Sequence, residues 1–266
     1  MESLTLADDG TLRLRYLPFP PHPKQWAMLA ADAKALAFGG AGGGGKTTAL
    51  LMGAAQYADV PGYEALLVRA NYTDITLPGS IGDAARQWFS KWAKPKKVNR
   101  GFRYEFPNGG AITIIGAPVE KWDDEILDRK YQFVGLDEAQ EFDTDTTFRY
   151  SMVRLRPPAP DLTEIQALSL FGPASDGTLI TEVQPRLRIA FTFYPDLPQP
   201  AGAVWVHRVI LDRETREVPL IPSTFLDNPA IDPDEYAKAL SLLPQKEQDR
   251  LMSPPLLGPD DDGTLP

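Results

Sequence analysis

Short runs of apolar residues alternate along the chain with longer segments in which apolar residues recur at helical spacing. The runs predict buried strands over residues 35–38, 65–69, 131–136 and 186–193. The longer segments predict helices over residues 46–57, 81–92, 145–155 and 233–252. Because strands that alternate with helices usually form a parallel sheet covered by helices, the pattern predicts an α/β fold with a mainly parallel sheet.

Two smaller features complete this pattern. Between residues 103 and 116, two β-rich runs flank Pro-Asn-Gly-Gly, which predicts an antiparallel β-hairpin inserted in the sheet. Prolines gather at residues 18–23 and 254–266, where they disfavour a helix. We therefore expect an extended lead-in over residues 1–24, one α/β domain over residues 25–252 and a linker or tail over residues 253–266.

The composition narrows the chemistry that this domain can perform. The chain has no cysteine and two histidines, which excludes a disulfide scaffold, a thiol nucleophile and a multi-histidine metal centre. A formal net charge of −9 argues against nucleic-acid binding by bulk positive charge but leaves room for a local basic patch. No apolar run is long enough to cross a membrane. We expect a soluble intracellular protein, with His22 and His207 in structural or exposed positions.

The segment FGGAGGGGKTT has the pattern of a phosphate-binding loop between a predicted strand and a predicted helix. Its expected binding residues are Gly40, Ala41, Gly42, Gly43, Gly44, Gly45, Lys46, Thr47 and Thr48. Glycines let successive backbone N–H groups approach a phosphate, and the helix N-terminus adds partial positive charge. Lys46 is expected to neutralise the β- and γ-phosphates, and the Thr47 hydroxyl to ligate Mg²⁺. The sequence therefore predicts a nucleoside-triphosphate site.

A second, acidic motif follows the strand predicted at residues 131–136, where Asp137 and Glu138 come directly after the apolar run. A carboxylate at the end of a strand beside the phosphate-loop strand can hold Mg²⁺, and the next carboxylate can activate the attacking water as a general base. Adjacent Asp and Glu favour an ATPase over a GTPase, which orients its water with glutamine. We expect Asp137 to be a metal ligand and Glu138 the base; an acidic helix cap is the alternative interpretation.

Several segments, in order, resemble the large terminase subunit of tailed bacteriophages, the ATPase motor that packs DNA into the procapsid. They are PHPKQWAML, the phosphate loop with the strand and turn after its helix, FPNGGAI, YQFVGLDEAQEF, YSMVRLR and FLDNPAIDPDEYAKALSLLPQKEQDRL. The resemblance covers about residues 18–252 and implies a RecA-like (ASCE) P-loop NTPase fold. It further implies that Gln25 contacts adenine and that ATP and Mg²⁺ are the cofactors. By the same resemblance, the chain would form a homo-oligomeric ring on a portal protein in the host cytoplasm, with a small terminase subunit and double-stranded DNA as partners.

Two departures from the family pattern bear on function. The family's coupling segment, Thr/Ser-x-Asn-Pro, aligns with Thr192–Pro195, where Tyr194 stands in place of asparagine. An amide that senses the γ-phosphate is therefore missing or supplied differently. The resemblance also ends where the family's nuclease domain begins, and the consecutive carboxylates Asp260–Asp262 cannot converge on a rigid two-metal site. We therefore expect no DNA cleavage by this chain.

Arginines and a basic patch are the remaining candidates. ATPase rings often use an arginine to stabilise charge on the transferred phosphoryl group. Arg129 is the first candidate, ahead of Arg154, Arg156 and Arg69, with surface salt bridging as the alternative for each. Five positive charges lie between residues 91 and 100. They could follow a DNA backbone without reading its sequence, or they could belong to a solvated loop.

The sequence thus favours an ATP-hydrolysing motor that drives double-stranded DNA, with two alternatives. A helicase-like RecA-fold ATPase would need a second RecA domain or a partner. A nucleotide-binding assembly remnant without turnover, or half of a split terminase, would fit both the tyrosine at position 194 and the missing nuclease. Turnover that DNA stimulates would separate the motor from the remnant.

Overall fold

The computed structural model describes residues 16–107, 109–156, 184–192, 203–212, 214–245 and 248. Most of the expected lead-in and the whole of the expected tail lie outside these residues. The same holds for Tyr194 and Pro195 of the coupling segment and for Asp260–Asp262.

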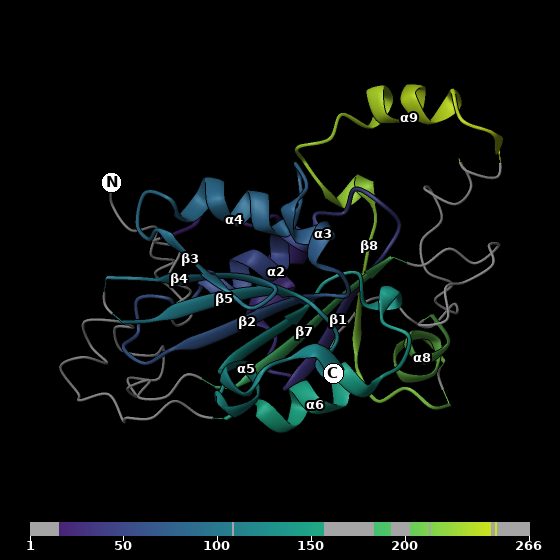
Figure 1. Ribbon diagram of the computed structural model, residues 1–266. Coiled ribbons are helices and arrows are strands. Elements are labelled where there is room, and N and C mark those ends of the chain that lie inside the picture. The colour runs from purple at the N-terminus through teal and green to yellow at the C-terminus, as the bar shows by residue number, and fades with distance from the viewer. Residues whose placement is uncertain are drawn as a thin grey trace, which may run out of the picture.

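Eight strands form one sheet at the centre of the described chain (Figure 1). They are β1 (Ala35–Gly40), β2 (Glu64–Arg69), β3 (Pro95–Val98), β4 (Gly101–Glu105), β5 (Ala111–Gly116), β6 (Phe133–Leu136), β7 (Arg186–Thr192) and β8 (Leu220–Ser223). Their order across the sheet is β3-β4-β5-β2-β6-β7-β1-β8. The pairs β3–β4 and β4–β5 are antiparallel, and the other neighbours are parallel. The prediction of a mainly parallel sheet with a β-hairpin insertion is confirmed.

The parallel strands bring the two sequence motifs to one edge of the sheet. Gly40 at the end of β1 is in register with Thr192 of β7 and Ser223 of β8. The loops after β1, β6, β7 and β8 therefore meet at the carboxyl edge, where open α/β sheets bind their ligands. The sequence placed the acidic strand β6 beside the phosphate-loop strand β1, whereas β7 lies between them. Asp137 and Glu138 thus reach the phosphate loop from the second strand away.

Helices cover both faces of the sheet. They are α1 (Pro23–Ala30), α2 (Lys46–Ala55), α3 (Tyr72–Thr76), α4 (Ile81–Phe89), α5 (Asp124–Asp128), α6 (Thr146–Arg154), α8 (Ala203–Val206) and α9 (Pro233–Ser241). Short 3₁₀ turns span Val119–Lys121, Ala139–Glu141 and Phe225–Asp227, and a π-helical turn spans His207–Leu211. Figure 1 shows α2, α3 and α4 on one face and α5, α6 and α8 on the other, while α9 stands apart from the sheet.

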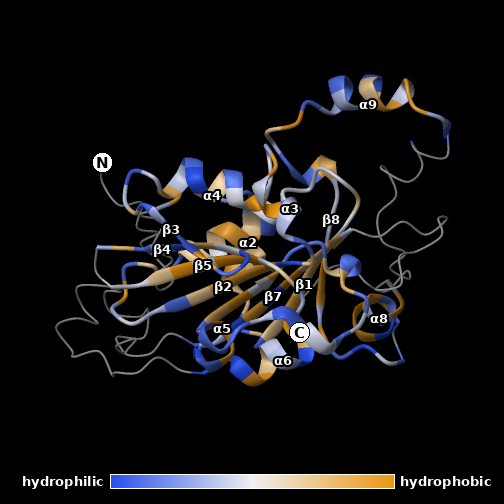
Figure 2. Cartoon of the chain, viewed as in Figure 1, coloured by the Kyte–Doolittle hydropathy of each residue, from blue (hydrophilic) through white to orange (hydrophobic). Residues whose placement is uncertain are grey.

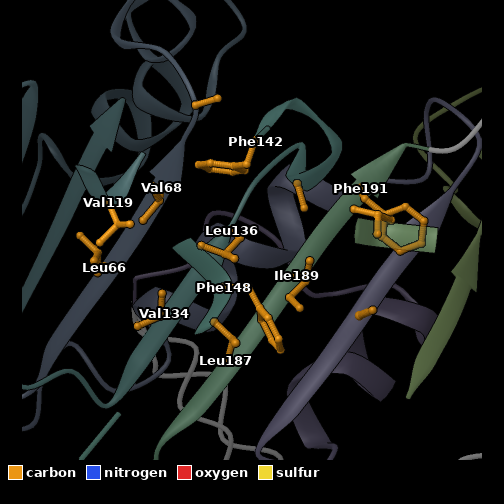
Figure 3. Packing of buried hydrophobic residues seen from close by; sticks show 14 of the residues in the cluster. Leu66, Val68, Val119, Val134, Leu136, Phe142, Phe148, Leu187, Ile189 and Phe191 are labelled. Carbon is orange, nitrogen blue, oxygen red and sulfur yellow. The ribbon is translucent and has the colours of Figure 1, made fainter. Parts of the chain in front are cut away.

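Burial on both faces explains the continuous apolar runs of the central strands, because successive side chains of a strand point to opposite faces. Leu66 and Val68 of β2 pack in one cluster, together with Phe148 of α6 (Figure 3). Leu67, between them, packs in another cluster with Leu50 of α2. Figure 2 shows the same division, with hydrophobic colour along the central strands and hydrophilic colour on the outer surfaces of the helices.

A buried arginine fixes α1 to the sheet. Arg188 of β7 donates hydrogen bonds to the carbonyl oxygens of Met28, Ala31 and Ala33 at distances of 3.1, 2.7 and 2.9 Å. These acceptors lie at the end of α1, where a helix leaves its last carbonyl groups without partners. Burial lowers the pKa of Arg188. The bonds hold α1 in place, and the first turn of that helix faces the phosphate loop.

The predicted strands and helices are present, with shifts of a few residues at most ends. The exception is the helix predicted over residues 233–252, which ends at Ser241 as α9. Pro244 follows closely and disfavours helix in the residue before it. The sequence analysis missed α1, the edge strand β3 and the last strand β8. Among the described residues, no helix has both the length and the apolar character needed to span a membrane.

Candidate nucleotide-binding site

The loop between β1 and α2 turns the chain from the sheet edge into a helix. α2 begins at Lys46, so its N-terminus faces the loop. Gly43 and Gly45 have φ values of +80° and +71°, which L side chains rarely adopt. Gly45 is the last residue before the helix, and its conformation makes the final turn. Glycine is therefore required at these two positions.

The segment after β8 holds the loop from behind. Ser223 Oγ donates a hydrogen bond to the carbonyl oxygen of Gly44 (3.1 Å), and Asn228 Nδ2 donates one to that of Gly43 (2.8 Å). A Cβ atom on Gly44 would lie 2.0 Å from Ser223 Oγ, so a larger residue there would push β8 away. The loop is thus held in a defined shape by its own glycines and by the strand beside it.

Helix α1 supports the loop with a capping box. Gln25 Oε1 accepts a hydrogen bond from the backbone N–H of His22, and His22 Nδ1 accepts one from that of Gln25. Gln25 Nε2 then donates to the carbonyl oxygen of Gly45 (3.0 Å). Gln25 is 2% exposed and does not line the cavity in front of the loop. The adenine contact expected of Gln25 would require its amide to leave both partners.

Lys46 is buried at the start of α2. Its Nζ donates a hydrogen bond to the carbonyl oxygen of Ala41 (2.6 Å), which lies in the same loop. Burial lowers the pKa of Lys46, and the nearby charges of Glu138 and Asp137 raise it in part. A cation in this position can pair with an anion that enters the loop, because it already lies at the helix N-terminus.

Asp137 connects the acidic strand to the phosphate loop. Thr47 Oγ1 donates a hydrogen bond to Asp137 Oδ1 (2.9 Å), and Arg69 Nη1 lies 3.5 Å from Asp137 Oδ2. Asp137 is fully buried, and burial together with the charge of Glu138 raises its pKa. Arg69 also bonds Glu141 (3.0 Å), so it bridges two acids beside the site. Of the candidate arginines, Arg69 is therefore the one next to the acidic motif.

Glu138 is held by a small network at the end of β7. Its Oε2 accepts hydrogen bonds from Thr192 Oγ1 (2.8 Å) and Gln140 Nε2 (2.6 Å). Gln140 Oε1 accepts a third bond from the backbone N–H of Thr192 (3.0 Å). Glu138 also has a φ of +50°, a strained conformation for a residue with a side chain. Strain of this kind at a charged residue commonly marks a functional site.

These groups surround an open cavity of about 400 Å³. The described residues that line it are Gly42, Gly43, Gly44, Gly45, Lys46, Thr47, Thr48, Glu138, Thr192, Asn228 and Ile231. The structure therefore brings Glu138 together with the phosphate loop. Of the expected binding residues, Gly40, Ala41 and Gln25 lie behind the lining.

The residues present fit a nucleoside triphosphate with Mg²⁺. The glycine loop, the helix N-terminus and the buried ammonium of Lys46 form an anion site. Asp137, Glu138 and the Thr47 hydroxyl offer oxygen ligands, which Mg²⁺ prefers. Among the described residues, no cluster of three or more His, Cys, Asp or Glu forms a metal site by itself. Mg²⁺ commonly binds through one or two carboxylates together with substrate phosphates, and this donor set matches that habit.

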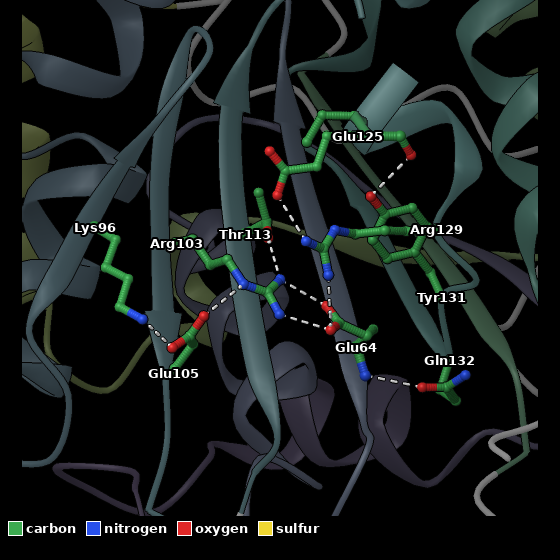
Figure 4. A network of polar contacts seen from close by, with 10 residues as sticks. Glu64, Lys96, Arg103, Glu105, Thr113, Glu125, Arg129, Tyr131 and Gln132 are labelled. Carbon is green, nitrogen blue, oxygen red and sulfur yellow. Dashed lines mark hydrogen bonds and ion pairs between the residues drawn. The ribbon is translucent and has the colours of Figure 1, made fainter. Parts of the chain in front are cut away.

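Arg129 lies at the opposite edge of the sheet. It pairs with Glu64 (3.2 Å) and Glu125 (2.6 Å), in a network that also includes Arg103 (Figure 4). Glu64 begins β2 and Arg69 ends it, roughly 17 Å further along the strand. Arg129 therefore does not reach the cavity of its own chain. A role for Arg129 at the nucleotide of a neighbouring subunit stays a prediction.

The other two candidate arginines also lie at this opposite edge. The backbones of Arg154 and Arg156 both pair with Tyr131, just before β6 begins. Their place in the fold separates them from the phosphate loop, which follows the carboxyl end of β1.

The basic segment forms an exposed edge of the sheet. Lys96 and Lys97 lie on β3, which has β4 as its neighbour and no described strand on its other side. Lys96 pairs with Glu105 across the two strands. Exposed lysines can contact a phosphate backbone, and they also prevent an edge strand from pairing with another chain. The segment is therefore part of the sheet and not the loop that was the alternative.

Comparisons with known proteins were made for the whole chain. No protein-family model matches it, and no curated protein matches it. Three solved structures of the large terminase from a thermophilic bacteriophage do match. The first is 11% identical over 88% of this chain and 53% of that one, with a TM-score of 0.55. The second, in complex with ADP, is 12% identical over 87% and 52%, with a TM-score of 0.53. The third, with ATP-gamma-S, is 12% identical over 88% and 52%, with a TM-score of 0.50.

The chain spans about half the length of these large terminases. At this level of identity the likeness concerns the fold. The RecA-like P-loop NTPase fold predicted from the sequence is confirmed, and the chain is similar in fold to about half of a phage large terminase.

Proposed function

We propose that the chain is the ATP-hydrolysing motor domain of a phage terminase large subunit, which drives double-stranded DNA into a procapsid. The observation that carries this proposal is the cavity that joins the phosphate loop to Glu138. The likeness to large terminases, one bound to ADP and one to ATP-gamma-S, supports ATP as the ligand.

Binding would begin at the phosphate loop. The N–H groups at the start of α2 and the Lys46 ammonium would hold the β- and γ-phosphates. For this, Lys46 exchanges its bond to the Ala41 carbonyl for bonds to phosphate oxygens. Thr47 and Asp137 would hold Mg²⁺, which supplies neutralising charge between the β- and γ-phosphates when it is bound.

Hydrolysis would depend on Glu138. Its carboxylate would accept a proton from a water molecule as the water oxygen attacks the γ-phosphorus, and the bond to the bridging oxygen would break to release ADP and phosphate. Thr192 and Gln140 hold the carboxylate oriented, each through a hydrogen bond to Oε2. Arg69 favours the charged form of Asp137 against the effect of burial, since an adjacent guanidinium lowers the pKa of a carboxyl.

Several partners belong to this proposal. Double-stranded DNA would contact the chain through phosphates, without sequence readout, and the exposed basic segment around β3 suits such contacts. A portal protein, a small terminase subunit and further copies of the chain in a ring would complete the motor. The net charge of −9 fits this arrangement if a basic face is turned to the DNA.

Release of phosphate from ATP by the purified chain tests the proposed activity. We expect turnover with Mg²⁺ and its loss when EDTA removes the metal, because Asp137 and Thr47 would otherwise face the phosphates without a cation. Adding Mg²⁺ back in excess should restore the rate. A chain that binds ATP with Mg²⁺ but releases no phosphate, even at high protein concentration, would contradict hydrolysis and favour the nucleotide-binding remnant.

A further inference from the structure

The order of strands at the carboxyl edge gives the cavity a direction. Across the edge, the strands run β6, β7, β1 and β8. Glu138 follows β6, Thr192 ends β7, and the phosphate loop follows β1. If Glu138 activates the attacking water, the γ-phosphate lies on this side of the loop. The rest of the nucleotide then extends across the glycines toward the segment that follows β8.

Ile231 lies on that far side. The position that a Cβ atom on Gly43 would occupy is 3.0 Å from Ile231 Cδ1. Among the described residues that line the cavity, Ile231 alone has a large apolar side chain, and it is partly exposed. Phosphates gain nothing from an apolar surface, whereas the base and ribose of a nucleotide do.

The segment that carries Ile231 is well fixed. Asn228 Nδ2 bonds the carbonyl oxygen of Gly43, and Asn228 Oδ1 accepts from the backbone N–H of Ala230 (3.1 Å). Upstream, Thr224 and Asp227 form a capping box. The side chain of Ile231 is therefore presented to the cavity by a turn whose position is tied to the phosphate loop.

From these observations we infer that Ile231 covers the nucleoside end of a bound nucleotide, and that Gln25 is a positioning residue for the phosphate loop. The inference rests on the proposed function, since it takes ATP as the ligand. Gln25 is buried, both ends of its amide are engaged, and it holds the carbonyl of Gly45 from behind. The adenine contact implied for Gln25 by the resemblance is thus reassigned to the other side of the loop.

Comparing ATP with inorganic tripolyphosphate tests this assignment, because tripolyphosphate lacks the nucleoside. Affinities are measured by calorimetry with Mg²⁺ present. In Ile231→Ala we expect ATP to bind about tenfold more weakly, as for loss of an apolar contact of this size, and tripolyphosphate to bind as in the wild type. Leu226→Ala is the matched control, since Leu226 lies on the same segment, is 68% exposed and does not line the cavity. It should leave both affinities unchanged.

Gln25→Met gives the opposite pattern. The side chain keeps its size but loses its bond to Gly45, so ATP and tripolyphosphate should weaken by the same factor. Thermal unfolding of each variant shows whether the fold is kept. Loss of ATP affinity alone in Gln25→Met, or equal loss of both ligands in Ile231→Ala, would overturn the assignment. An unchanged ATP affinity in Ile231→Ala would do the same.

The two proposals fail in different ways. A wild-type chain that binds neither ligand contradicts the proposed function and the inference together. A wild-type chain that binds ATP without hydrolysing it contradicts the proposed hydrolysis alone, while the two affinities still decide the placement of the nucleoside.

Discussion

Glu138→Gln should lower the ATP turnover rate by at least about 100-fold, the lower end of what a general base contributes. Glutamine has the shape of glutamate, and its amide oxygen can still accept the hydrogen bond from Thr192 Oγ1. The amide cannot accept the proton of the attacking water. We therefore expect ATP affinity to stay within a few-fold of the wild type, while phosphate release in single-turnover and steady-state assays falls together.

The matched control for this variant is Glu125→Gln. It removes a carboxylate of the same kind at the opposite edge of the sheet, where Glu125 pairs with Arg129. Turnover there should match the wild type. Two results would contradict the assignment of Glu138 as the base: a turnover rate in Glu138→Gln close to the wild type, or a loss of ATP binding as large as the loss of turnover.

Lys46→Met should weaken ATP binding by about 100-fold or more, in the range measured when one partner of a buried charge pair is removed. Methionine roughly matches the length of the lysine side chain but carries no charge. Lys46 is the only cation among the described residues that line the cavity, so no neighbour there can replace it. Titration of the protein with ATP and Mg²⁺ in a calorimeter measures this effect directly.

Lys34→Met is the control, because Lys34 is exposed and lies just before β1, at the end of that strand away from the loop. Its ATP affinity should equal that of the wild type. If Lys46→Met bound ATP as tightly as the wild type, the phosphate loop would not be the site of binding. The proposed function would then fail at its first step.

The contiguous parts of the site could be predicted from the sequence. The phosphate loop is a single segment in which each glycine and the Lys-Thr pair has a local reason, and the structure places it between β1 and α2 as expected. Asp137 and Glu138 were also found, because an apolar strand followed by two acids is a local signal. Their distance from the loop depends on strand order, which the sequence does not show directly.

The supporting residues could not be found in this way. Ser223, Asn228 and Ile231 reach the cavity because β8 pairs with β1, and β8 is a short strand with little local pattern. Gln140 binds Glu138 through the turn after β6, and a glutamine in a turn has no distinctive signal. Long-range pairing, which sequence patterns describe poorly, decides all of these positions.

The arginines show the same limit. Arg129 precedes Asp137 closely along the chain, yet it pairs with Glu64 at the amino end of β2. Arg69 is far from Asp137 in sequence but lies beside it, since β2 and β6 are parallel neighbours. Closeness along the chain therefore ranked these two candidates in the wrong order for a contact with the acidic motif within one chain.

The central claim is that this cavity powers a motor acting on double-stranded DNA. Its most direct test is the rate of ATP turnover by the wild-type chain with Mg²⁺, measured with and without linear duplex DNA over a range of protein concentrations. The account predicts turnover that rises when DNA is added and that Glu138→Gln abolishes under both conditions. Turnover that duplex DNA leaves unchanged at every protein concentration would contradict the motor.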